Sequence, residues 1–446
     1  MKIRSQFIKA AHRYLNLGYC YNSNLELINT RKYPVNAQKS YKNLLSKIRA
    51  WEYIIFLCSS AAFVTLKGIL LGKLLNHIEY ASYNYFQIIS GFGCIFIGAG
   101  IILRHHVELP SLLKENNSGK LYAFTSQSHS ILIANSLISC IALSLFSFFS
   151  NGEVLLAALG AWQAILLLTF TLELIKLKSG EYFTKYAQKL LIRNLVIFLV
   201  AAATAYVTKN AIKTALAEVA INTILTGNLL ITYCKNTSLP NLNYIKKTLK
   251  YIPLELFGAL SQYQDRLAAS FILSKMEFSR FSYFFIIINI GITLQQFINT
   301  KLIVSFSTEE VTSAFRKFRL GSISLTGIIV FTTSFVLITI SSINMAPHWL
   351  NLDLESLCLI ICIATFKGAD LTQSYLICRH MKKLALILQL TATTTFILGM
   401  IYIYHQKITD LMYFLKFIAT WQFICLTIST LIIWLKNRKQ ETCCNG

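Results

Sequence analysis

Ten ionisable side chains lie inside long apolar segments of the chain, where a charge costs free energy unless it has a partner or a function. Guanidinium and ammonium groups bind phosphate well, whereas an intramembrane carboxylate suits a cation or a proton. Binding of an ion or of a phosphate-bearing molecule is therefore the chemistry that these residues offer. Five are basic and five are acidic: Lys67, Arg266, Lys301, Lys367, Lys416, Glu173, Glu218, Glu255, Asp265 and Asp370.

About twelve predicted membrane-spanning helices carry these residues. Of the 446 residues, 55% are hydrophobic and only 14% are charged, which excludes an ordinary soluble enzyme and a disordered chain. A helix crosses the bilayer with about 20 apolar residues. Runs of about that size occur at 51–72, 83–103, 130–150, 154–175, 191–208, 212–234, 251–273, 281–304, 320–343, 354–376, 384–404 and 410–435. The predicted fold class is all-α, a polytopic membrane protein.

The basic residues predict the orientation of these helices. With the N-terminus in the cytoplasm, 31 of the 42 Lys and Arg residues fall in cytoplasmic segments or at the adjoining span ends, while six fall in external loops or at their adjoining span ends. This bias is typical of a protein with both termini cytoplasmic. It also accounts for the net charge of +23, so we expect no nucleic acid partner. No metal-ligand spacing or nucleotide motif occurs, and we expect no cofactor.

The two halves of the chain carry an internal repeat. A shift of 198 residues gives seven identities between 65–93 and 263–291, including Glu79 on Glu277 and Gly93 on Gly291. Because each half holds six helices, the repeat is parallel, and such halves enclose a central cavity. The predicted organisation is a cytoplasmic basic tail 1–50, an N-terminal six-helix bundle 51–234, a cytoplasmic linker 235–250, a C-terminal six-helix bundle 251–435 and a cytoplasmic tail 436–446.

The segment DRLAASFILSKMEFSRFSYFF, residues 265–285, resembles a motif of the polysaccharide-export flippases. In that family, Asp-Arg is followed by an apolar run and then by Leu, an acidic residue, an apolar residue, Gly, any residue, Tyr and Ser. Ser279 replaces the Gly and Phe281 replaces the Tyr. The matching residues are Asp265, Arg266, Leu273, Glu277, Phe278 and Ser282, with a fainter copy at Glu79, Tyr80, Ala81 and Tyr83. The chain is thus similar to O-antigen repeat-unit flippases, in the superfamily that includes multidrug and toxin extrusion transporters.

This resemblance implies a bacterial inner-membrane transporter, not an enzyme. It implies translocation of undecaprenyl-pyrophosphate-linked oligosaccharide by alternating access, with membrane lipids and other polysaccharide-assembly membrane proteins as further partners. It places the cavity between the first, second, seventh and eighth spans. The substrate-binding residues expected there are Arg266, Lys67, Lys301, Asp265, Asn84, Gln87, Gln264 and Gln295, and no catalytic residue is expected.

The charges leave alternatives open. The repeat shift places Lys67 on Asp265, so these two either pair and close the outward side, or Lys67 and Arg266 hold the pyrophosphate while Asp265 couples to an ion gradient. Lys67 could also extend to the outer surface. Lys367 and Asp370 share a helix face and are expected to pair with each other. Three acidic residues are expected near span ends, in contact with solvent: Glu173, Glu218 and Glu255.

The sequence also bears on three other functions. A multidrug or cation antiporter on the same fold would favour an acidic cavity, whereas this one leans basic. An O-antigen polymerase or ligase would need a large external loop, and the predicted external loops are short. A peptidoglycan-precursor flippase is a close relative in chemistry.

Overall fold

The computed structural model describes residues 35–115, 117–149, 154–350, 353–379 and 381–444, and within these ranges the chain forms helices and no strands. The all-α prediction is therefore confirmed. The chain divides into two compact units, Met1–Phe56 and Leu57–Gly446. The described part of the first unit is the beginning of helix α2, and everything that follows concerns the second unit.

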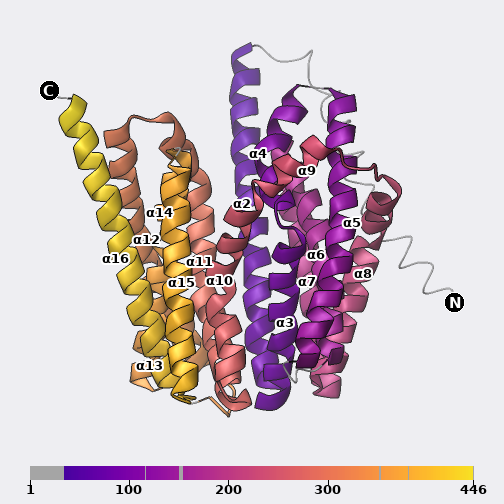
Figure 1. Cartoon of the computed structure of the whole chain (residues 1–446), viewed down its shortest axis with the longest axis vertical. Helices are drawn as coiled ribbons and strands as arrows, with labels where there is room; N and C mark the ends of the chain where they lie inside the picture. The colour runs from indigo at the N-terminus through magenta and orange to yellow at the C-terminus, as the bar shows by residue number, and fades with distance from the viewer. Residues whose placement is uncertain (1–34, 116, 150–153, 351–352, 380, 445–446) are drawn as a thin grey trace. The chain divides into compact units, whose positions relative to one another are not determined.

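Helices α2 to α8 form the first half of the bundle (Figure 1). A short helix, α9 (Leu242–Leu249), leads into the second half. The bounds in the first half are α2 Val35–Leu74, α3 His77–Ile97, α4 Ile101–Lys114, α5 Ser118–Phe149, α6 Val154–Ser179, α7 Phe183–Thr208 and α8 Ala211–Lys235. Those in the second half are α10 Ile252–Ile272, α11 Lys275–Thr308, α12 Val311–Ser342, α13 Leu354–Gly368, α14 Thr372–Cys378, α15 Lys382–His405 and α16 Leu411–Cys444.

The length and composition of these helices make the chain a polytopic membrane protein. Among the described residues, eight helices are long and apolar enough to cross a membrane, and the bent pair α3 and α4 makes a ninth candidate. The twelve ranges predicted from the sequence each overlap one of the helices, or a pair interrupted by a break. The bundle and tail boundaries predicted from the sequence stay predictions.

Two of the spans are interrupted. Between α3 and α4 the helix axis bends by 54°, and Gly100 adopts a left-handed backbone with φ of 78°. Between α13 and α14, Asp370 uses its side chain to accept hydrogen bonds from the backbone amide and the hydroxyl of Thr372. A polar backbone within a membrane needs such partners, because lipid offers none.

The repeat is visible in the positions of the elements. Helix α2 ends at Leu74 and α10 ends at Ile272, while α3 begins at His77 and α11 begins at Lys275. Both pairs of positions are 198 residues apart, which is the shift that the sequence predicts. The two halves therefore begin with the same helical hairpin.

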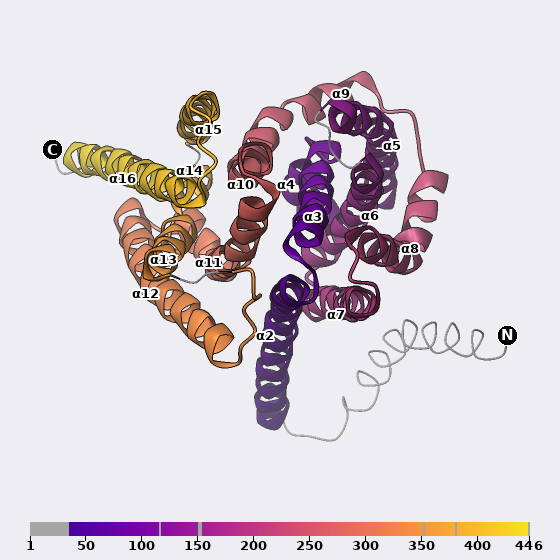
Figure 2. The ribbon, with the colours of Figure 1, turned by 90° about the horizontal axis from the view of Figure 1, so that it is seen from below.

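The halves meet along these two hairpins, as Figure 2 shows, with α3 packed on α10 and α11. Small residues allow the approach: a Cβ atom on Gly68 would lie 2.4 Å from Ile286, and one on Gly91 would lie 2.5 Å from Tyr263. Glycine at such contacts lets helices pack closely within a membrane. We call this contact between α2, α3, α10 and α11 the seam.

Candidate functional site

A buried polar network occupies the first half beside the seam. Lys67 of α2 places its Nζ 3.1 Å from the Oε1 of Glu218 on α8. Tyr83 of α3 donates its hydroxyl to the same carboxylate, and Gln87 Nε2 donates to it at 3.2 Å. Glu218 is only 3% exposed, so the expectation that it is solvated near a span end is wrong.

The network continues one turn along α8, at Asn222. Arg193 of α7 donates through Nε to Asn222 Oδ1 at 3.0 Å, and Asn222 donates through Nδ2 to Gln163 Oε1 at 3.2 Å. These three residues are also buried. The ammonium of Lys67 and the carboxylate of Glu218 thus neutralise each other, while the Arg193 guanidinium is held by amide oxygens. The spacing of Glu218 and Asn222, four residues apart on one helix face, is the sequence signal for this network.

The second half has a different ion pair. Asp265 of α10 pairs with Lys367 of α13, and their side chains are 2% and 8% exposed. Lys67 therefore pairs with Glu218, and the predicted pair between Lys67 and Asp265 is wrong. The predicted pair between Lys367 and Asp370 is also wrong, because α13 ends at Gly368 and Asp370 stabilises the start of α14.

Arg266 is held by aromatic rings. Its guanidinium carbon lies 4.1 Å from the ring centre of Tyr263 and 4.4 Å from that of Phe285, and the Nζ of Lys367 lies 5.2 Å from the same Phe285 ring. Within the described chain, no carboxylate is in ion-pair range of this guanidinium, and its buried Nε has no hydrogen-bond partner. Arg266 is therefore a cation at the seam without a counter-charge, next to the Asp265–Lys367 pair.

The other predicted binding residues divide into separate groups. Gln87 belongs to the first-half network, whereas Asn84 donates to the backbone of Tyr80 at 2.8 Å. Gln295 donates to the backbone of Asp370 at the α13–α14 break. Gln264 is buried, and both its amide atoms lack a partner among the described residues. The side chain of Lys301 lies outside the described residues. Among the predicted binding residues, the structure therefore brings Lys67 and Gln87 together at Glu218, and Asp265 and Arg266 together at the seam. Beside Arg266 it adds Phe285, which the sequence prediction missed, and Lys367, which was expected to pair with Asp370.

Helix α9 is fixed to the first half by Arg104 of α4. The guanidinium donates through NH1 to the Tyr244 carbonyl at 3.0 Å and to Thr248 Oγ1 at 2.8 Å, and it stacks 3.7 Å from the Tyr244 ring. Glu108 neutralises it at 3.0 Å. Burial raises the pKa of the Tyr244 hydroxyl above its usual value. Arg104 thus has a structural partner and is not available to a ligand.

Glu255 connects the two halves at the same end. From the first turn of α10, its Oε2 accepts the backbone N–H of Gly100 at 2.6 Å and that of Leu103 at 3.3 Å. These amides begin α4, where a carboxylate complements the helix dipole. The remaining charges are simpler: Glu173 pairs with Lys189 at 2.8 Å, and Lys416 pairs with Glu355 at 2.6 Å.

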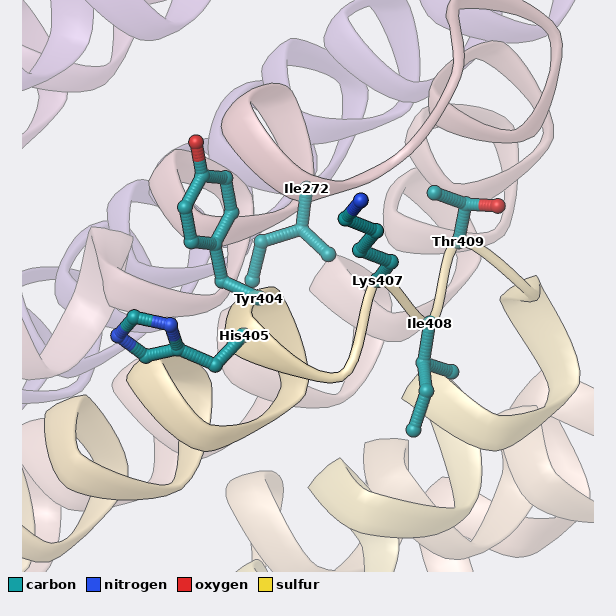
Figure 3. Close-up of a pocket in the computed structure, with 6 residues that line it drawn as sticks. All are labelled: Ile272, Tyr404, His405, Lys407, Ile408 and Thr409. Atoms are coloured by element: carbon teal, nitrogen blue, oxygen red, sulfur yellow. The ribbon is translucent and has the colours of Figure 1, made fainter.

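A pocket of about 290 Å³ lies at the end of α10, where α15 joins α16. Figure 3 shows the Lys407 ammonium between Ile272 and Thr409, while His405 points away from them. The other residues that line the pocket are Tyr404 and Ile408. None of the sequence-predicted binding residues lines this pocket, so it is separate from the Arg266 site.

Comparison with solved structures identifies the fold. The chain is similar to the inward-facing conformation of a multidrug resistance MATE family transporter of the MOP superfamily, with a TM-score of 0.55 and 11% identity over 86% of this chain and 96% of that one. The outward-facing conformation of such a transporter gives a TM-score of 0.53 and 14% identity over 88% and 96%. A MATE in complex with MaL6 gives 0.55 and 12% over 88% and 97%. No family model matches the chain, and no curated protein is similar to it in sequence. The likeness therefore shows a MATE-like fold of two halves.

Proposed function

We propose that the protein is an alternating-access transporter that moves an undecaprenyl-pyrophosphate-linked O-antigen repeat unit across the bacterial inner membrane, with both termini in the cytoplasm. The observation that carries this proposal is Arg266, a guanidinium at the seam that has no carboxylate partner among the described residues. An intramembrane charge without a partner marks a binding function. Arginine suits phosphate because its planar fork forms two parallel hydrogen bonds to phosphate oxygens.

The similar solved structures favour a second candidate, a multidrug or cation antiporter. A cationic substrate would need a carboxylate, and two acidic groups near the seam could supply one, Glu218 and Asp265. Lys67 and Lys367 already neutralise them, so a cation would have to displace a buried ammonium. A diphosphate needs no such displacement, because Arg266 has no ion-pair partner in the part of the chain that the structure describes. The charges at the seam therefore favour an anionic head group.

The proposed cycle follows from this geometry. The diphosphate enters between the halves and pairs with Arg266, while the polyprenyl chain remains in lipid. Rocking of the halves then exposes the head group to the other side. Membrane proteins that assemble the oligosaccharide would deliver the substrate and receive the product. Asp265 is the first residue to test for coupling to a proton or sodium gradient, since it is a buried carboxylate next to Arg266.

The function is tested by deleting the gene and analysing the lipid-linked oligosaccharides. We expect complete repeat units to accumulate on their lipid carrier at the cytoplasmic side while surface polysaccharide is lost. Single repeat units that reach the surface without lengthening would instead show a polymerase. An unchanged profile would favour the antiporter.

The role of Arg266 is tested with a matched pair of variants in proteoliposomes that contain the lipid-linked oligosaccharide. Arg266→Gln and Lys416→Gln each remove one positive charge from a span, but Lys416 is exposed and paired with Glu355. Loss of a charge-assisted hydrogen bond should lower the initial rate about tenfold or more for Arg266→Gln. For Lys416→Gln we expect the initial rate to fall less than about twofold, because an exposed ion pair contributes little. Equal rates for both variants would refute the assignment of Arg266.

A further inference from the structure

Three aromatic side chains from the two halves interlock at the seam. They are Tyr80 of α3, Tyr283 of α11 and Trp349, which follows α12. The ring centres are 6.4 Å apart for Tyr80 and Tyr283, 5.6 Å for Tyr80 and Trp349, and 6.3 Å for Tyr283 and Trp349. We call these three residues the aromatic plug. The exposed fractions of its members are 1%, 0% and 7%, so the plug fills the contact between the halves.

Both halves hold the plug in place. A Cβ atom on Gly72 of α2 would lie 2.7 Å from the Tyr283 ring, so glycine makes room for this ring. Lys73 donates from Nζ to the Asn344 carbonyl at 2.9 Å, which ties the end of α2 to the segment that carries Trp349. The Trp349 carbonyl accepts a hydrogen bond from Arg280 Nε at 3.3 Å. The plug therefore closes the seam at the α2–α3 turn.

The plug contains two buried donors that the protein does not satisfy. Tyr80 donates its hydroxyl to the Gly68 carbonyl at 3.3 Å. Among the described residues, Tyr283 Oη and Trp349 Nε1 have no hydrogen-bond partner. A buried donor without an acceptor costs free energy, and a phenylalanine would fill the same space without this cost. Such groups call for a function in another state of the molecule.

We propose that the aromatic plug is a carbohydrate-binding subsite, uncovered when the halves separate at this end. This inference rests on the proposed function. Tyrosine and tryptophan present an apolar face and a polar donor together, which matches the apolar C–H face and the hydroxyl groups of a pyranose ring. The closed state leaves both donors unpaired, whereas a sugar supplies acceptors to them. A sugar-bearing ligand therefore binds the open state selectively and shifts the equilibrium toward it.

The test uses single-atom variants of two tyrosines. Tyr283→Phe removes a plug hydroxyl that has no partner among the described residues, and the matched control Tyr85→Phe removes another such buried hydroxyl from α3, outside the plug. Each purified protein is placed in proteoliposomes with one of two probes, undecaprenyl diphosphate carrying the repeat-unit oligosaccharide or undecaprenyl diphosphate alone. The initial rate of translocation is measured below saturation, and the melting temperature is measured in detergent.

We expect Tyr283→Phe to move the sugar-bearing probe about fivefold more slowly, the effect of one lost hydrogen bond between uncharged groups. The rate for the sugar-free probe should match that of the wild type, and the melting temperature should rise, because the closed state loses an unpaired donor. Tyr85→Phe should leave the ratio of the two rates unchanged, because its hydroxyl lies outside the plug. A rise in melting temperature alone would show a structural role.

The outcomes separate this inference from the proposed function. A wild-type protein that translocates neither probe would refute both. An active wild type with an unchanged rate ratio in Tyr283→Phe would refute the carbohydrate subsite alone. Equal slowing of both probes would also refute it, because the hydroxyl would then act on the conformational change and not on the sugar.

Discussion

At the scale of single residues, the first-half network predicts a large effect from removing one charge. In Lys67→Met, Glu218 stays buried without its ammonium partner, and we expect the free energy of unfolding to fall by about 3–5 kcal/mol. The double variant Lys67→Met/Glu218→Gln should recover most of this loss, because the amide still bonds Tyr83 and Gln87. Thermal unfolding in detergent micelles measures both changes. Equal stability of the single and double variants would contradict the assigned pair.

The sequence identified the charged residues but not their partners. Lys67 and Glu218 are 151 residues apart, and Asp265 and Lys367 are 102 apart. A helical pattern predicts which residues share a face, but it does not predict which helix lies opposite. The i, i+3 argument for Lys367 and Asp370 failed for a local reason, since it assumed an unbroken helix and α13 ends between them. Arg266 could be singled out by its position, whereas its aromatic neighbour Phe285 could not.

At the scale of elements, the α3–α4 break predicts opposite effects for two glycines. Gly100→Ala should lower stability by about 1–2 kcal/mol, because a left-handed backbone disfavours a side chain. Its Cβ atom would also lie 2.7 Å from the Thr248 carbonyl oxygen. Gly327 lies inside α12 with open space around it. Gly327→Ala should therefore raise the free energy of unfolding, by at most about 1 kcal/mol, because alanine has the higher helix propensity. Melting temperatures of the two variants test this, and a shift of the same sign in both would contradict it.

A second element-scale prediction concerns the start of α4. In Glu255→Ala, the amides of Gly100 and Leu103 lose the carboxylate that caps them from α10. Loss of a helix cap costs about 1 kcal/mol, so hydrogen exchange at residues 100–103 should become about fivefold faster. Mass spectrometry of the exchanged protein measures this, with the α9 peptide 242–249 as an internal control. Unchanged exchange at residues 100–103 would show that the cap contributes little.

The spans were predictable because apolar length is a strong signal, while their interruptions were not. The run at 83–103 crosses the α3–α4 break, and its composition stays apolar through Gly98 and Gly100. Glycine alone does not reveal a break, since Gly68 and Gly72 lie inside an unbroken α2. The backbone conformation of Gly100 depends on its contacts with Thr248 and Glu255. Both residues are about 150 residues away along the chain. Residues 1–34 of the predicted basic tail lie outside the described residues.

At the scale of the whole molecule, the two-half architecture follows from the repeat. Identical spacing of the first hairpin in each half, at 198 residues, appears both in the sequence and in the helix ends. The substrate does not follow from the fold, because one fold can carry different binding sites. Among the described residues, Glu218 and Asp265 each pair with a lysine of their own half, whereas Arg266 has no carboxylate partner. The proposal of an anionic substrate rests on this difference in pairing.

The orientation of the whole molecule yields a final prediction. If each of the twelve ranges crosses the membrane once, an even number of crossings places both termini on one side, and the basic residues place that side in the cytoplasm. Alkaline phosphatase, which is active only outside the cytoplasm, should be inactive when fused after Gly446 and active when fused after Lys407. Fusion after Lys209 should also be active, and fusion after Lys250 inactive. Reversed activities at all four sites would show an inverted protein, or α3 with α4 entering and leaving the membrane on the same side. Inactivity after both Lys250 and Lys407, with activity after Gly446, would instead show that α13 with α14 enters and leaves the membrane on the same side.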